Sequence, residues 1–156
     1  CGAMLDIGVY ALSIVRSFMD KKPEEIVSQR KVSPTGSDEQ ATILLKNDLN
    51  QMAVVALSMH SKQPKRAMIS CEKGYIEIME FPRAEKATIV DAVTGAKTEI
   101  DCGCTADALR YELTDMEQAV SRQNADDMKL AFSRDVMDIM TKIRKDWNMK
   151  YPGEDW

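Results

Sequence analysis

The run Met52-Ala-Val-Val-Ala-Leu-Ser-Met-His60 decides how the middle of the chain folds. Apolar side chains stand at odd and even positions alike, so a strand made from this run is apolar on both faces. Both faces then need a cover. Helices of the same chain can cover one face, and a second copy of the sheet or a neighbouring domain is the candidate for the other. We therefore expect a homodimer through the open sheet face; a fully wrapped monomer is the alternative.

Short runs rich in Ile, Val, Thr and Met extend on both sides of this strand. The connections between them are short and carry turn residues such as Lys73-Gly74 and Thr94-Gly95. They leave no room for crossover helices, so neighbouring strands should pair antiparallel in one open sheet of about six strands. The predicted strands are Glu25–Val32, Glu39–Leu45, Gln51–His60, Arg66–Cys71, Tyr75–Glu80, Ala87–Asp91 and Lys97–Asp101.

Helical periodicity replaces the strand pattern at both ends of the chain. An opening helix runs to Phe18-Met19 and stops at Asp20-Lys-Lys-Pro23. Residues 106–122 form a helix after a possible cap at Thr105, with Leu109, Leu113, Met116 and Val120 on one stripe. Asn124 starts a last helix with Asp126 and Asp127 in its first turn, which buries Met128, Phe132, Val136, Ile139 or Met140, Ile143 and Trp147. This order predicts an α+β fold with helices packed on one face of the sheet.

Composition bounds the class of protein. The chain has 156 residues, 44% of them hydrophobic and 29% charged, which predicts a single domain over residues 1–156. The net charge is only −4 and the basic residues are scattered, so we expect neither a nucleic acid nor a membrane surface as partner. No apolar run approaches the roughly 20 residues of a membrane span, and no leader precedes the opening helix. The sequence predicts a cytoplasmic protein.

Cysteine and histidine are too few to build a site. The cysteines at positions 1, 71, 102 and 104 are too sparse for a disulfide-built fold, which favours reduced thiols. Cys102-Gly-Cys104 has no histidine or second cysteine pair at ligand spacing, so we expect no metal. His60 stands alone, without a nucleophile motif, and is predicted to be a strand-end or surface residue.

The opening segment, Cys1-Gly-Ala-Met-Leu-Asp6-Ile-Gly8-Val-Tyr10, concentrates the chemical groups of the chain, and so abrupt a start predicts a fragment. Asp6 and Tyr10 are four residues apart, so they share one face of a helix, where a carboxylate and a phenol can handle protons. Alternatively, Asp6 is a first-turn acid favourable to the helix dipole and Tyr10 an amphipathic surface residue. Gly2 and Gly8 let a bound molecule approach the helix backbone, or let the helix pack closely on the sheet.

Five stretches of this sequence together resemble one known family. The chain is similar over essentially its whole length to the C-terminal domain of the glucose-fructose oxidoreductase, inositol dehydrogenase and MocA (Gfo/Idh/MocA) family. The stretches are the opening ten residues, Pro23-Glu-Glu-Ile-Val, Asp38-Glu39 before a strand, Ile69-Ser-Cys-Glu-Lys-Gly74-Tyr-Ile-Glu-Ile, and Met137-Asp-Ile-Met-Thr-Lys-Ile-Arg144.

The resemblance implies a role in hydride transfer. An N-terminal Rossmann domain, absent from this chain, would bind NAD or NADP, and the present domain would supply the substrate pocket, the dimer sheet and part of the catalytic machinery. The substrate would be a small molecule, a sugar, polyol or cyclic diol. Many members carry His where this chain has Tyr10, and Tyr resembles the subgroup that includes dimeric dihydrodiol dehydrogenases.

The same resemblance assigns roles to residues. Tyr10 would exchange the proton of the reacting hydroxyl, while Asp6 would hydrogen-bond substrate or orient the proton path, and Gly2 would lie against substrate. A lysine in a Glu-Lys-Pro motif of the absent domain would favour the ionised phenol.

The glycine pattern limits what this chain does alone. No Gly-x-Gly occurs in the sequence, so the dinucleotide fingerprint is missing and we expect weak cofactor binding and no activity from this chain by itself. The alternative from another class is a non-catalytic interaction or dimerisation module. A zinc or thiol-redox enzyme built on Cys102 and Cys104 lacks further ligands.

Overall fold

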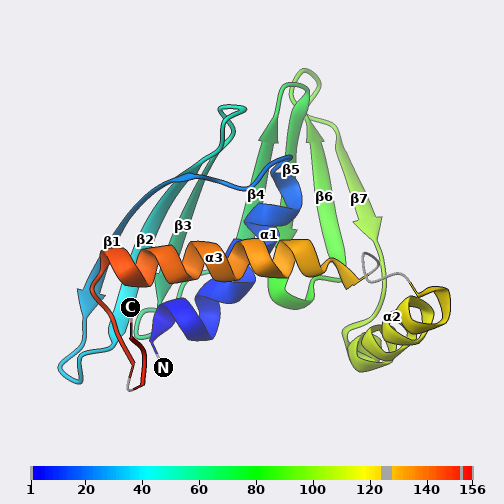
Figure 1. Ribbon diagram of the computed structural model, residues 1–156. Helices are drawn as coiled ribbons and strands as arrows, with labels where there is room; N and C mark the ends of the chain where they lie inside the picture. The colour runs from blue at the N-terminus through cyan, green and yellow to red at the C-terminus, as the bar shows by residue number, and fades with distance from the viewer. Residues whose placement is uncertain (1, 124–127, 152, 156) are drawn as a thin grey trace. The chain divides into compact units, whose positions relative to one another are not determined.

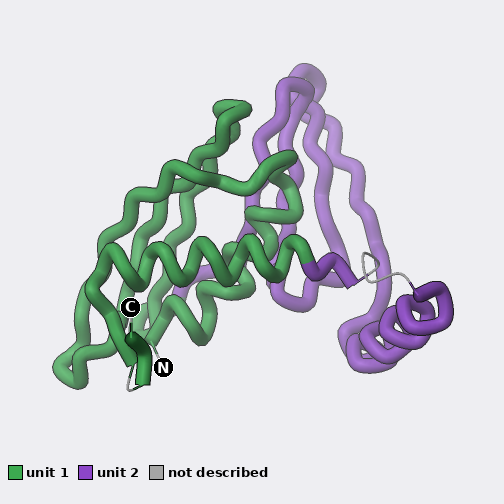
Figure 2. The backbone as a smooth tube through the Cα atoms, in the orientation of Figure 1, with its two compact units in different colours: residues 1–62, 131–156 green, residues 63–130 purple. Residues whose placement is uncertain are grey.

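The computed structural model describes residues 2–123, 128–151 and 153–155 (Figure 1). The chain divides into two compact units, unit 1 with residues 1–62 and 131–156 and unit 2 with residues 63–130 (Figure 2). The prediction of one domain over residues 1–156 stays a prediction. The elements in chain order are η1 (Met4–Gly8), α1 (Val9–Phe18), β1 (Glu25–Val32), β2 (Asp38–Lys46), β3 (Met52–Ser58), β4 (Arg66–Cys71), β5 (Gly74–Met79), η2 (Phe81–Arg83), β6 (Lys86–Asp91), β7 (Lys97–Asp101), η3 (Thr105–Asp107), α2 (Ala108–Arg122) and α3 (Leu130–Asp146).

Unit 1 contains an antiparallel sheet in the order β1-β2-β3. Alternation along β2 buries Ala41, Ile43 and Leu45, whereas Thr42 and Leu44 point to the opposite, exposed face. The helices α1 and α3 lie together along this sheet (Figure 1), and the apolar side of α3 buries Val136, Ile139, Met140 and Ile143. The core of unit 1 therefore lies between one sheet face and the two helices.

Unit 2 contains an antiparallel meander in the order β4-β5-β6-β7. Short turns join its strands, and Gly74 is required at the first of them, since a side chain there would meet the Val90 carbonyl oxygen at 1.9 Å and its φ is +156°. Among the described residues of this sheet, only Val90 is buried.

The α+β class, the antiparallel pairing and the helices on one sheet face are confirmed. In the described residues, the seven predicted strands form two hydrogen-bonded sheets, one in each unit, and not one open sheet. The segment 59–65 between β3 and β4 separates them, and a sequence pattern that shows strands does not show with which neighbour each strand pairs.

The helices near the C-terminus differ from prediction in two ways. The stripe Leu109, Leu113, Met116 and Val120 of α2 is exposed, between 52% and 73% in each side chain. Thr105 is not a side-chain cap: Asp107 precedes α2 without a capping bond, while the Thr105 hydroxyl donates to the Arg83 carbonyl. The predicted start at Asn124, with Asp126 and Asp127, lies outside the described residues. Within the described part of the chain, no helix combines the length and apolar character needed to cross a membrane.

Candidate functional site at the opening helix

The predicted site residues lie on a helix with an irregular first turn. Residues Met4–Gly8 form a π-helical turn that continues directly into α1. Such turns are rare and are found disproportionately at functional sites. Asp6 lies within the π-helical turn and Tyr10 in the first turn of α1, so the structure brings the predicted pair onto one continuous helix.

Both side chains are available to a ligand. Asp6 is exposed, and Tyr10 is 53% exposed. Neither the Asp6 carboxylate nor the Tyr10 hydroxyl has a hydrogen-bond or ion-pair partner among the residues that the structure describes. Polar side chains inside a protein normally use their hydrogen-bonding groups on protein partners. Asp6 and Tyr10 do not, so their polar atoms can bind an external molecule.

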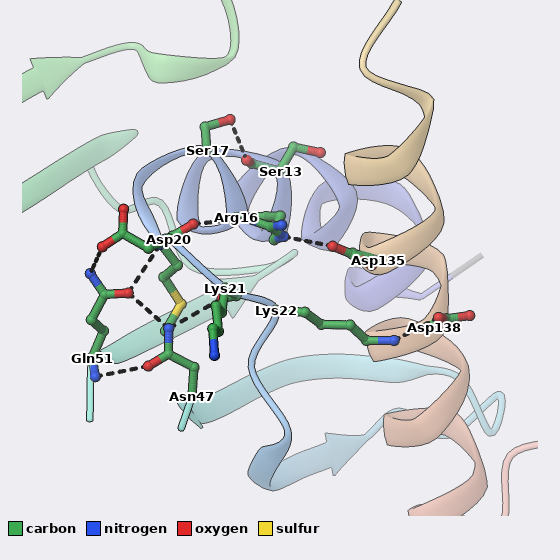
Figure 3. Close-up of polar contacts among 11 residues, drawn as sticks. Ser13, Arg16, Ser17, Asp20, Lys21, Lys22, Asn47, Gln51, Asp135 and Asp138 are labelled. Carbon is green, nitrogen blue, oxygen red and sulfur yellow. Dashed lines mark hydrogen bonds and ion pairs between the residues drawn. The ribbon is translucent and has the colours of Figure 1, made fainter. Parts of the chain in front are cut away.

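The opposite side of the helix is fixed against unit 1. Gly8 is buried, and a Cβ atom there would lie 3.1 Å from both Leu57 Cδ1 and Met4 Sδ. Close packing of the helix on β3 therefore accounts for this glycine, which was one of the two predicted reasons. Arg16 anchors the far end: its Nε lies 2.7 Å from Asp135 Oδ2 of α3, and its guanidinium donates to the Met19 carbonyl (Figure 3).

Gly2, the third residue predicted to contact substrate, is buried beside Asp38. A Cβ atom at Gly2 would lie 1.7 Å from Asp38 Oδ1, so the carboxylate occupies the space of a side chain. Asp38 Oδ2 accepts a hydrogen bond of 2.6 Å from the Met4 backbone N–H. The contact of Gly2 with substrate stays a prediction.

A second acidic residue follows Asp38 in β2. The Lys31 ammonium lies 2.7 Å from Glu39 Oε1 and lowers the pKa of that carboxyl, and the charge of His60 lowers the pKa further. His60 itself is exposed just beyond β3, which confirms the prediction of a surface residue. Glu39 is thus kept ionised by a fixed partner and does not pair with the helix.

The described residues show neither a dinucleotide-binding turn nor a group of metal ligands. Both sheets are antiparallel throughout, and no Gly-x-Gly turn leads from a strand into a helix. Among the described residues, no group of three or more His, Cys, Asp or Glu side chains could hold a metal ion. Cys71, Cys102 and Cys104 are free thiols, as predicted for these three.

Comparison with known families gives one match over the first half of the chain. Residues 1–77, which include the opening helix and the whole β1-β2-β3 sheet, match the family described as the GFO/IDH/MocA C-terminal domain. The first half of the chain is thus similar to the C-terminal domain of the Gfo/Idh/MocA family. This confirms the family resemblance of the sequence motifs.

Curated proteins that are similar to this chain include diol dehydrogenases. The chain is 26% identical over 162 residues to the trans-1,2-dihydrobenzene-1,2-diol dehydrogenase of Xenopus laevis, covering 97% of this chain and 48% of the relative. The enzyme of the same name from Danio rerio is 26% identical over 161 residues, covering 96% of this chain and 47% of the relative. The chain thus spans about half the length of the curated relatives it matches.

Solved structures share the fold of this chain. The UDP-N-acetylglucosamine 3-dehydrogenase GnnA from Acidithiobacillus ferrooxidans has a TM-score of 0.75 at 18% identity, over 91% of this chain and 46% of that one. A 3-ketoreductase from Actinomadura kijaniata, in complex with TDP-benzene and NADP, has a TM-score of 0.63 at 18% identity, over 81% of this chain and 42% of that one.

Sequence reasoning missed two residues that hold the opening helix. Arg16 shares a helix face with Leu12 and Met19, and a charge on an apolar stripe is a usable signal of a buried ion pair. Asp38 was noticed only as part of a family motif. Its hydrogen bond with Met4 joins residues 34 positions apart, so no local sequence pattern predicts it.

Proposed function

We propose that this chain is the substrate-binding half of an NAD(P)-dependent oxidoreductase that acts on a hydroxyl-bearing carbon of a sugar, polyol or cyclic diol. The observation that carries the proposal is the exposed, unpaired pair of Asp6 and Tyr10 on a helix whose other side is fixed in the core. The family match and the diol dehydrogenases among the relatives give the reaction class.

The nicotinamide, bound mainly by the other half of such an enzyme, would take the hydride. Oxidation of the alcohol also releases the hydroxyl proton, and the exposed Tyr10, as the phenolate, would accept it and become the neutral phenol. Asp6, on the neighbouring turn, is placed to accept a hydrogen bond from a substrate hydroxyl and so hold the reacting carbon. In the reverse direction Tyr10 would return the proton to the carbonyl oxygen.

The first test of this role is Tyr10→Phe in the full-length protein, assayed with NAD and NADP on a panel of sugars, polyols and diols. The loss of a proton-transfer group should lower kcat by about 10²–10⁴-fold while cofactor affinity is unchanged. Tyr111→Phe is the matched control, because Tyr111 is a similarly exposed tyrosine on α2, 41% exposed, outside the proposed site. Equal turnover by the wild-type and Tyr10→Phe proteins would remove Tyr10 from the mechanism.

The outward face of the unit 1 sheet supports the proposed dimer. Val27 pairs with Leu44 and Leu44 with Val54, so these side chains form a continuous row on the face opposite to the helices, beside Met52. Val54 is 69% and Val27 65% exposed. We call Val27, Leu44, Met52 and Val54 the outward patch. A second copy of the same patch would bury it, whether the protein is an enzyme or only a dimerisation module.

Val54→Lys tests the dimer. A lysine in the middle of the outward patch should convert the protein to monomers in size-exclusion chromatography with light scattering, at unchanged thermal stability of the subunit. Lys31→Arg, on the same face at the edge of β1, is the control that keeps the charge there constant. A wild-type protein that is monomeric at all concentrations would contradict the proposed dimer.

A further inference from the structure

Asp38 is a buried carboxylate that no part of the proposed reaction uses. It is the first residue of β2 and is 1% exposed. Its Oδ2 accepts the hydrogen bond of 2.6 Å from the Met4 N–H, and its Oδ1 is buried without a hydrogen-bond partner in the described residues. A buried carboxylate with a half-satisfied acceptor set is costly, so its position calls for a reason.

That reason lies at the start of the opening helix. The first N–H groups of a helix have no partner within the helix, and a side chain usually caps them from the residue just before. Here the N-cap residue is Ala3, which has no side-chain acceptor. Asp38 therefore supplies the cap from another element, with a negative charge at the positive end of the helix dipole.

Gly2 and Asp38 fit each other. A Cβ atom at Gly2 would meet Asp38 Oδ1 at 1.7 Å, Cγ at 2.5 Å and the Asp38 backbone nitrogen at 2.9 Å. Two of these three atoms belong to the carboxylate and the third to the backbone of β2. A side chain at Gly2 would therefore displace the carboxylate and also press on the β2 backbone. Glycine at this position is thus the condition for the carboxylate to reach Met4.

The capped turn is also the turn that carries Asp6. Met4 is the first residue of the π-helical turn, and Asp6 follows two residues later. A π-helical turn is less favourable than an α-helical one and needs outside contacts to persist. Asp38 holds this turn at its start, while Gly8 holds it against Leu57 at its end.

From this geometry we propose that Asp38 is a positioning residue: with Gly2, it fixes the π-helical turn that presents Asp6, and through α1 Tyr10, to substrate. The inference rests on the proposed function, since it assigns Asp38 a part in that site. Asp38 does not touch substrate, and its effect on the reaction passes through the helix. Errors of about 1 Å in the placement of reacting groups cost about 10²-fold in rate.

The experiment compares Asp38→Ala and Asp38→Asn in the full-length protein. Asp38→Ala should lower kcat by about 10²-fold at unchanged affinity for NAD(P), and Asp38→Asn, which keeps an acceptor oxygen of the same reach, should recover most of the rate. In an Asp6→Asn background, the added Asp38→Ala should cost less than it does alone, because one of the two groups that it positions is already lost. Gly2→Ala displaces the same carboxylate from the other side and should reproduce Asp38→Ala.

Hydrogen exchange by mass spectrometry gives a readout that needs no activity. Exchange in peptides covering residues 4–10 should increase in Asp38→Ala and not in Glu39→Gln, the neighbouring carboxylate that binds Lys31. If Asp38→Ala is too unstable to assay, Gly2→Ala takes its place, and its exchange is compared with that of Asp38→Asn.

The outcomes separate the two proposals. An active wild-type protein whose kcat is unchanged in folded Asp38→Ala overturns the positioning role and leaves the proposed function intact. A rate loss that adds fully to that of Asp6→Asn, or that Glu39→Gln shares, also overturns it, because general destabilisation would explain it. A wild-type protein inactive on the whole panel overturns the proposed function and this inference with it, and the exchange data then describe a structural cap only.

Discussion

Unit 1 and unit 2 each contain an antiparallel sheet, yet they differ in how they bury apolar side chains. In unit 1, α1, α3 and the inner face of β1-β2-β3 share a core that includes Leu12, Ile43, Leu45 and Ile143, all fully buried. In the described part of unit 2, only Val90 and Ala119 are buried apolar residues, while the α2 stripe is exposed. Since hydrophobic burial is the main stabilising term, the difference locates the stability of this chain in unit 1.

The two units also differ in the surfaces that they expose: unit 1 carries the proposed site, and unit 2 exposes apolar side chains. The proposed site stands on the unit with the core, where a rigid support can hold Asp6 and Tyr10 in place. Unit 2 offers amphipathic elements whose apolar sides remain uncovered in this chain.

Core truncation is the largest expected effect. Ile143→Ala in α3 removes a fully buried side chain and should lower the free energy of unfolding by about 2–5 kcal/mol in urea denaturation. Leu113→Ala in α2 removes a side chain that is 73% exposed and should change it by no more than about 0.5 kcal/mol. Equal losses in the two variants would break the comparison, because they would show that the α2 stripe is buried in solution.

Ion pairs give a smaller effect in the same direction. In unit 1, Asp135 pairs with Arg16 at 2.7 Å, and the two side chains are only 20% and 10% exposed. Asp135→Asn should lower the free energy of unfolding by about 1–3 kcal/mol, because the largely buried guanidinium loses its counter-charge while keeping its bond to the Met19 carbonyl.

The matched pair in unit 2 is Lys86 and Asp101, at 3.2 Å and with side chains 64% and 67% exposed. The Asp101 carboxylate raises the pKa of Lys86, but solvent screens so exposed a pair, and Asp101→Asn should leave the denaturation midpoint unchanged. A clear loss in Asp101→Asn, with none in Asp135→Asn, would reverse the proposed distribution of stability.

Local elements of both units could be predicted from the sequence. The bounds of β1, β4 and β7 match those predicted, because turn residues delimit apolar alternation over a few residues. The last helix buries Val136, Ile139, Met140 and Ile143 as predicted, because the 3.6-residue period marks one face. The other residues predicted to be buried are only half-buried: Met128, Phe132 and Trp147.

Features that depend on distant partners could not be predicted. The stripe of α2 has the pattern of a buried face, but a pattern does not say whether anything covers it. The division into two sheets depends on which strand finds which neighbour, and the cap of Met4 by Asp38 joins residues 34 positions apart. Asp6 and Tyr10 could be placed on one helix from their spacing, whereas the π-helical turn depends on contacts outside the helix.

The smallest expected effect lies in the β6–β7 turn of unit 2. Asp91 Oδ1 accepts bonds from the Thr94 N–H at 2.7 Å, the Thr94 hydroxyl at 2.8 Å and the Val93 N–H at 3.0 Å, and the Thr94 and Val93 bonds lower the pKa of the Asp91 carboxyl. A lowered pKa means that the turn gains stability above the ordinary carboxyl pKa and loses it as the pH falls through the lowered value.

Acid should therefore loosen this turn. Thr94→Val removes the hydroxyl donor and should raise the pKa of Asp91 toward its ordinary value, as read from an NMR titration of the carboxyl carbon. Thr98→Val, on β7 beside the turn, is the control, since among the described residues Asp91 accepts no bond from Thr98. If Asp91 titrates identically in the wild-type and Thr94→Val proteins, the bond from the Thr94 hydroxyl does not stabilise the ionised carboxylate, and this prediction is wrong.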